Sequence, residues 1–495
     1  MPMGTRVLAL LAVTLLAWHG TGAAAGDLRL VEAARNQNWP LVRSLLKQKV
    51  DVNAPQPDGA TALHWAVYWD DAGAIDALIA AGAKINAANE FGATPLWIAS
   101  TEGRARIIER LLRAGADARA ALLTGETALM TASRVGDVET VKLLLASGAD
   151  VNARERSRNQ TALMWAVSEQ HADVVQVLLE QGADAGARSL VRRMLGNAGA
   201  DGLQRLTGDY TDLIDEAQGG FTPLLFAARI GDLASARLLV DKGARVNDEA
   251  PTGASALHIA ILSGQPHVAA FLVDSGADPN SSTGGYTPLH TAVLRGDQAL
   301  VKKLLDKGAD PNALLTGSTP GRRNSQDWAL HPSWIGATPM WLASKFMEAG
   351  LMRILAAAGA DSRFVKKDGT TVLMAALTPG PGRRTSIQAA PPDPKEVERQ
   401  ALEAVRTAAD LGADVNAASA AGDSPLHVAA ARRFDSVVEL LAERGANLGA
   451  KNKKGQTPLG VAAAAVQRRP TDPAYGEQQR PSSTAELLRK LGAPE

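Results

Sequence analysis

One acid and one imidazole lie four residues apart, at Asp327 and His331, in the stretch 315–334. A carboxylate beside an imidazole is the smallest set of side chains that can move a proton, so the pair is a candidate for hydrolysis. Trp328 and Trp334 in the same stretch could instead form a platform for a small molecule, a cell-wall saccharide or a protein partner. The alternative is that both rings fold back and fill a widened joint in the scaffold.

Signatures of the common enzyme classes are missing from the rest of the sequence. The chain has no Gly-x-Ser-x-Gly, no His-Glu-x-x-His, no phosphate-binding loop, no dinucleotide fingerprint and no EF-hand loop. "SLLK" at 44–47 matches the Ser-x-x-Lys of serine β-lactam enzymes, but the other motifs of that set do not accompany it. We therefore predict a non-enzymatic protein without catalytic residues or a cofactor.

Four histidines occupy the same place in a short phrase that recurs along the chain: His64, His258, His290 and His427. Equivalent positions of adjacent repeats lie about 10 Å apart, which is too far for two imidazoles to bind one metal ion. The sequence has no cysteine, so disulfides and thiolate metal sites are excluded. We predict no metal site.

The recurring phrase reads "TALHWAV" at 61–67 and "TPLWIAS" at 94–100, and it sets the architecture. Its first residue, Thr or Ser, stands at 61, 94, 127, 161, 222, 255, 287, 338, 371, 424 and 457. Most of these intervals are 32–34 residues, and a fixed period of this size is the signature of a solenoid built from one supersecondary unit.

The unit that begins at Thr127 shows how local chemistry builds the repeat. Thr127 can cap a first short helix, and a second helix over 137–147 places Val141 and Leu144 on one apolar stripe together with Leu145. Gly148 then provides the left-handed end of that helix, and a glycine recurs 21 residues after nine of the openings. A helix pair this short cannot bury its apolar face alone, so neighbouring units must stack.

The phrases "GYTPLHTAV" (285–293), "LLDKGADPNA" (304–313) and "GDSPLHVAA" (422–430) resemble the consensus of the ankyrin repeat family. The resemblance covers nearly all of 27–495. It implies an all-α ankyrin-repeat solenoid of helix–turn–helix units with hairpin-like connecting loops, about twelve units including degenerate ends. It also implies that the repeated histidines hydrogen-bond to adjoining turns.

Departures from the period define the expected domain boundaries. We expect a signal peptide at 1–25, a degenerate capping repeat at 26–55, repeats at 56–188, an insertion at 189–217, repeats at 218–314, a second insertion at 315–334, and repeats at 335–495 interrupted by Pro-rich insertions at 378–398 and 469–482. The first insertion is expected to contain a helix of its own, and 378–398 has the composition of a loop.

The resemblance implies that a partner binds to hairpin tips and to the ends of first helices, where exposed aromatic and Arg side chains form interaction hot spots. These positions hold Tyr68, Trp69, Phe91, Arg134, Phe221, Arg229, Tyr286, Arg295, Trp334, Lys345 and Phe346. Trp328 and His331 of the stretch 315–334 complete the candidate set. By contrast, the tryptophans inside the phrase are expected in the core: Trp65, Trp97, Trp165 and Trp341.

Charge and the first residues of the chain bear on partners and location. Lys and Arg total 52, as do Asp and Glu, so no overall field attracts nucleic acid or an anionic membrane. Arg6, the apolar run 7–18 and the alanines at 23–25 are typical of a signal peptide cleaved after Ala25; the alternative, a membrane anchor, needs about 20 apolar residues. The Ala- and Arg-rich composition favours a bacterial source. We therefore expect a scaffold for protein–protein interaction in the periplasm or outside the cell.

Overall fold

The computed structural model describes residues 27–197, 213–282, 284–318, 330–378, 393–464 and 483–494. The predicted signal peptide lies outside these residues, as do the middle parts of the insertions. The chain divides into two compact units. Unit 1 comprises residues up to Arg192 together with Gln218–Ala250, and unit 2 comprises Arg193–Ala217 together with Pro251–Glu495.

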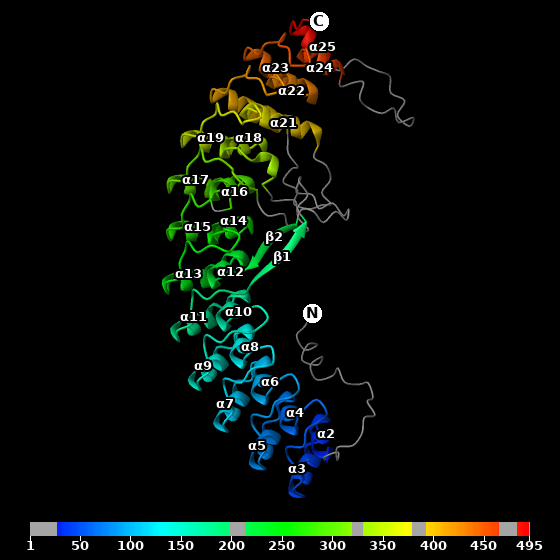
Figure 1. Ribbon diagram of the computed structural model, residues 1–495, viewed down its shortest axis with the longest axis vertical. Helices are drawn as coiled ribbons and strands as arrows, with labels where there is room; N and C mark the ends of the chain where they lie inside the picture. The colour runs from blue at the N-terminus through cyan, green and yellow to red at the C-terminus, as the bar shows by residue number, and fades with distance from the viewer. Residues whose placement is uncertain are drawn as a thin grey trace, which may run out of the picture. The chain divides into compact units, whose positions relative to one another are not determined.

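Short helices in pairs make up the repeats of unit 1, and they follow one another in a stack (Figure 1). They are α2 (Arg29–Arg35), α3 (Trp39–Lys47), α4 (Ala62–Tyr68), α5 (Ala72–Ala80), α6 (Pro95–Thr101), α7 (Ala105–Arg113), α8 (Ala128–Val135), α9 (Val138–Ala146), α10 (Ala162–Ser168), α11 (Ala172–Glu180), α12 (Pro223–Ile230) and α13 (Leu233–Asp241). First helices pack on first helices, as α6 does on α4 and α8, and second helices pack on second helices, as α9 does on α7 and α11.

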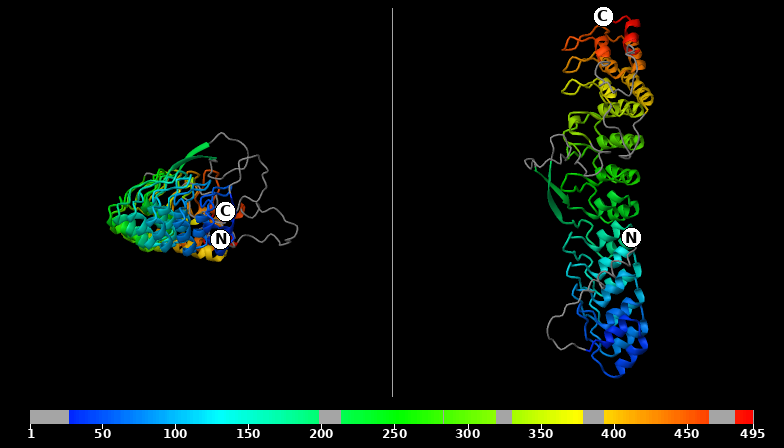
Figure 2. Two further views of the ribbon diagram at one scale, coloured as in Figure 1. Left: turned by 90° about the horizontal axis from the view of Figure 1, so that it is seen from below. Right: turned by 90° about the vertical axis from the view of Figure 1, so that its right-hand side faces the viewer.

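Unit 2 repeats the same arrangement. Its helices are α14 (Ala256–Leu262), α15 (Pro266–Asp274), α16 (Pro288–Arg295), α17 (Gln298–Asp306), the 3-10 helix η1 (Pro332–Trp334), α18 (Pro339–Lys345), α19 (Ala349–Ala357), α20 (Val372–Leu377), α21 (Pro394–Asp410), α22 (Pro425–Arg432), α23 (Asp435–Glu443), α24 (Pro458–Ala464) and α25 (Ser483–Lys490). In each unit, the loops that join successive repeats project to one side of the helices (Figure 2). Among the described residues, no helix is long and apolar enough to cross a membrane.

The predicted caps of the repeat are present. Thr127 Oγ1 accepts a hydrogen bond from the N–H of Met130 at 3.2 Å and so starts α8. Gly148 has a φ of +84°, which only glycine adopts readily, and its neighbour Ala149 donates its N–H to the carbonyl of Leu144 at 3.0 Å. All nine glycines that the spacing singled out have φ between +81° and +92°. The predicted all-α ankyrin-type solenoid is therefore confirmed.

A ladder of asparagines, which we did not predict, ties each repeat to the next one. The amide of Asn86 donates to the carbonyl of Gly115 at 3.1 Å and accepts from the N–H of Asp117 at 2.8 Å. The same pair of hydrogen bonds recurs at other repeats, where Asn53, Asn152, Asn280, Asn312 and Asn416 make it. Each amide thus hydrogen-bonds a carbonyl and an N–H in the turn that follows the second helix of the next repeat, where the helix itself provides no partner for them.

The structure adds to one expectation about the insertions and corrects another. The described ends of the first insertion form a two-stranded sheet of β1 (Val191–Asn197) and β2 (Leu213–Gly219), which we did not predict. Its middle, 198–212, lies outside the described residues, so the helix expected within this insertion stays a prediction. The insertion 378–398 ends earlier than we predicted, because α21 already begins at Pro394 and runs for 17 residues. Asp393 caps this helix by accepting from the N–H of Lys395 at 3.0 Å.

Candidate functional site

An aromatic cluster lies at the end of α4 in unit 1. The rings of Trp65 and Tyr68 meet edge-on with centroids 5.8 Å apart, and those of Tyr68 and Trp69 do so at 4.8 Å. Trp69 is 38% exposed, yet its indole N–H donates to the carbonyl of Arg35 at 3.0 Å. The guanidinium of Arg35 lies 5.6 Å from the centroid of the Trp65 ring. The exposed indole of Trp69 is thus held in a fixed position.

Further along unit 1, a second cation lies over a ring. The guanidinium of Arg134, on α8, is 4.9 Å from the ring centroid of Trp165 on α10. Glu126 lies 3.7 Å from the same guanidinium and keeps it in place. The indole N–H of Trp165 is buried and has no hydrogen-bond partner among the described residues.

The third such cluster lies on α12 and the residues before it. Phe221 and Phe226 pack edge-on at 5.6 Å, and the guanidinium of Arg229 lies 5.2 and 5.1 Å from their two centroids. Arg229 is exposed, and Phe221 is half-buried. Since first helices stack on one another from α4 through α12, the three clusters form a row along one side of unit 1, which we name the aromatic–arginine row.

Three predicted contact residues of unit 2 are buried, so our expectation of exposure is wrong for them. Tyr286 is 3% exposed and packs edge-on against His258 at 5.3 Å. Trp334 is 5% exposed and packs against Phe346 at 5.4 Å, as expected if it fills a joint between repeats. Lys345 is 9% exposed. Exposure at a repeat position depends on which neighbours pack over it, and the sequence does not display them.

The other predicted residues are placed as follows. Phe91 is half-buried at a hairpin, where its carbonyl accepts from the N–H of Leu123 at 3.0 Å. His331 Nδ1 accepts from the N–H of Ser333 at 3.1 Å and thereby caps η1. Asp327, its proposed catalytic neighbour, and Trp328 lie outside the described residues. Proton transfer in the stretch 315–334 therefore stays untested.

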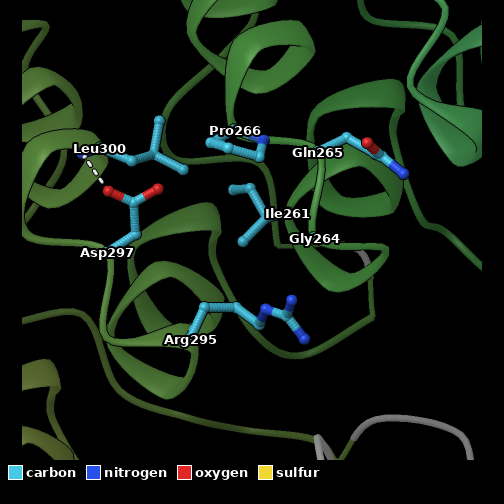
Figure 3. A pocket seen from close by; sticks show the side chains of 7 residues that line it. All are labelled: Ile261, Gly264, Gln265, Pro266, Arg295, Asp297 and Leu300. Atoms are coloured by element: carbon cyan, nitrogen blue, oxygen red, sulfur yellow. Dashed lines mark hydrogen bonds between the residues drawn. The ribbon is translucent and has the colours of Figure 1, made fainter.

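Arg295 lines a small pocket of about 190 Å³ in unit 2 (Figure 3). The other lining residues are Ile261, Gly264, Gln265, Pro266, Asp297 and Leu300. The carboxylate of Asp297 points back to its own helix, because it accepts from the N–H of Leu300 at 3.0 Å and caps α17 (Figure 3). The carboxylate in the pocket lining is therefore engaged in capping a helix.

The repeated histidines are structural. His64 Nδ1 accepts from the N–H of Thr61 at 3.0 Å, and its Nε2 lies 3.0 Å from the carbonyl of Ala93 in the next repeat. Burial lowers the pKa of His64, His258 and His290 to about 4, so these imidazoles are neutral near pH 7. The predicted hydrogen bond to the adjoining turn is confirmed for three of the four repeated histidines, which are His64, His258 and His427. Among the described residues, no group of three potential ligands could hold a metal ion.

The tryptophans within the phrase lie where we expected them, although not all are fully buried. Trp65, Trp97 and Trp341 are 3–6% exposed, and Trp165 is half-buried. We did not predict that cations would lie over these rings. A signal was available for Trp65 and Trp165, because Arg35 and Arg134 lie in the last turns of the first helices of the preceding repeats.

Comparison with known families agrees with this architecture. The family model for three consecutive ankyrin repeats matches residues 30–121, 107–189, 189–283 and 253–314, and the model for a single ankyrin repeat matches 421–453. Together the matches span more than half of the 495 residues. A search of curated proteins finds no match to the chain. On its helix pairs, its caps and these matches, the chain belongs to the ankyrin repeat family.

Proposed function

We propose that this protein is a non-enzymatic scaffold that binds a protein partner through the aromatic–arginine row of unit 1. Ankyrin repeats point to protein–protein interaction in general. The observation that supports this particular surface is Trp69, an exposed indole held in place by a hydrogen bond to the carbonyl of Arg35 and an edge-on contact with Tyr68. A large side chain that is already ordered loses little entropy on binding, and Trp, Tyr and Arg dominate measured hot spots.

The arginines of the row support the same surface. Arg134 and Arg229 stack on rings, so their guanidinium groups are oriented before a partner arrives. Arg229 remains exposed at its outer edge. An oriented guanidinium can form two parallel hydrogen bonds with a carboxylate or carbonyl of the partner, which adds direction to the apolar contact at Trp69.

We place this interaction in the periplasm or outside the cell, on the signal-like pattern of residues 1–25. Cell fractionation, with mass spectrometry of the amino terminus, tests the location. The mature chain should start at Gly26 in the exported fraction. An uncleaved chain in the cytoplasm would contradict it.

Photo-cross-linking tests the surface. A photoreactive amino acid in place of Trp69 should give a specific protein adduct in the cells that make this protein. The matched control is the same replacement at Leu491, which is 37% exposed against 38% for Trp69 but lies in unit 2. Adducts of equal yield at both positions, or no adduct at position 69, would contradict the proposal that a partner binds at this surface.

A further inference from the structure

A cluster of positive charges surrounds a buried ring in unit 2. The ring is that of Trp341 on α18, which is 3% exposed. The ammonium of Lys345 lies 5.8 Å from its centroid, and the ammonium of Lys366 lies 5.3 Å from it. Arg432, the exposed last residue of α22, adds a third positive charge close enough to act on Lys345. We name these four residues the Trp341 site.

Negative charge at the Trp341 site is scarce. Lys366 is paired with Asp368 at 2.7 Å and also donates to the carbonyl of Ser333 at 2.8 Å. The hydrogen bonds that Lys345 makes within the described residues go to the carbonyl and the hydroxyl of Thr378, which are neutral acceptors. Among the described contacts of these cations, the only carboxylate is that of Asp368, and it is paired with Lys366.

Two further observations indicate that the site is incomplete. Trp341 Nε1 is buried and has no hydrogen-bond partner among the described residues, although buried donors in native proteins are nearly always paired. Burial, followed by the charges of Arg432 and Lys366, lowers the pKa of Lys345 to about 8, so the ammonium still carries its proton near pH 7 at a cost to the fold. An anion would supply both the missing acceptor and the missing charge.

We propose that the Trp341 site binds a carboxylate, carried by an Asp or Glu side chain of a protein partner. A singly charged group suits this buried site better than a dianionic phosphate, because removing a second negative charge from water costs more free energy. The proposal rests on the proposed function only in taking a protein as the source of the carboxylate. All four residues of the Trp341 site belong to unit 2, whereas the aromatic–arginine row belongs to unit 1.

The test reads the indole N–H of Trp341 directly. Full-length mature protein with ¹⁵N-labelled tryptophan is titrated with a capped decapeptide of glutamate, and Trp341→Phe assigns the resonance. The Trp341 signal should shift and saturate. The signal of Trp97 is the internal control, because its N–H is also buried and unpartnered, but no cation lies over its ring in the described part of the chain. A decaglutamine peptide should leave both signals in place.

Variants connect the shift to the charges. Lys345→Met, which removes the positive charge and leaves a side chain of similar length, should weaken binding of the glutamate peptide at least about tenfold. Arg432→Gln, at an exposed position that does not endanger folding, should weaken it severalfold. Arg444→Gln is the matched control, because Arg444 is paired with Asp410 at 2.7 Å and does not belong to the Trp341 site. This variant should bind the glutamate peptide like the native protein.

Several results would overturn the proposal. They are an unmoved Trp341 signal, equal shifts with the glutamine peptide, native affinity in both Lys345→Met and Arg432→Gln, or tighter binding of inorganic phosphate than of the glutamate peptide. None of these outcomes bears on Trp69, whose cross-linking tests the proposed function separately.

Discussion

At the residue scale, buried imidazoles link adjacent repeats through hydrogen bonds. In the capping boxes of α4 and α16, the ring of His64 or His290 accepts from the first N–H of its own phrase, a role that requires an unprotonated Nδ1. Protonation would both remove that acceptor and place a charge in the core. These residues therefore link the stability of the repeats to pH.

We predict that stability falls as the pH drops from about 6.5 to about 4. The folded-state pKa of His64, His258 and His290 lies near 4 and the ordinary value is 6.5. In this window the unfolded chain binds more protons than the native one, so acid favours unfolding; above 6.5 the contribution is complete. Each histidine accounts for roughly 1.4 kcal/mol per pH unit across the window.

Urea denaturation of the native protein and of His290→Gln at pH 7 and pH 4.5 checks this prediction. The variant should lose less stability on acidification than the native protein does. His267→Gln is the control, because His267 is exposed, and it should behave like the native chain. An identical pH response of His290→Gln and the native protein would show that this histidine is not the linked group.

At the element scale, the repeats depend on hydrogen bonds between one turn and the next. Asn86→Ala should destabilise the protein by about 1–3 kcal/mol, because it leaves the carbonyl of Gly115 and the N–H of Asp117 without their partner. Asn36→Ala is the matched control, since Asn36 is exposed and its side chain makes no hydrogen bond in the described structure. Equal melting temperatures of the two variants would contradict a stabilising role of the asparagine ladder.

The first half of the long helix α21 is hydrogen-bonded to α23. The carboxylate of Glu398 accepts from the N–H and the hydroxyl of Ser436, at 2.9 and 2.7 Å. Glu398→Ala should cost about 1–3 kcal/mol, as for other hydrogen bonds to a charged group. Glu403→Ala on the same helix, whose pairing with Arg353 at 3.4 Å is exposed, should cost far less in a thermal melt. The reverse order would show that this contact does not fix the helix.

Period and caps made the repeats predictable, because each is encoded within a few residues. Thr127 and Gly148 act through their own neighbours, so their spacing was enough to place α8 and α9. The strands β1 and β2 and the first turn of α21 were missed, since no repeat constraint acts on an insertion. In the candidate site, the signal for Trp69 and Arg229 was their repeat position. The burial of Tyr286 and Lys345 depends on tertiary neighbours, and two of the cations over rings, Arg35 at Trp65 and Lys366 at Trp341, come from other repeats.

At the scale of the whole molecule, the two units carry different candidate sites on one scaffold. Unit 1 carries the aromatic–arginine row, whose exposed member Trp69 is fixed by Arg35. Unit 2 carries the Trp341 site, where cations surround a buried ring. Because stability in repeat proteins is a sum of local terms, a substitution in one unit should leave the fold of the other intact. The two sites can therefore be tested one at a time.

The dissociation constant of the cross-linked partner, once purified, tests the central claim most directly. It is measured by calorimetry for the native protein, Trp69→Ala and Leu491→Ala. Truncating a central hot-spot residue typically weakens binding by 2 kcal/mol or more, so Trp69→Ala should bind at least about 30-fold more weakly. Leu491→Ala should bind like the native protein. Native affinity in Trp69→Ala, with its melting temperature unchanged, would contradict a partner surface on unit 1.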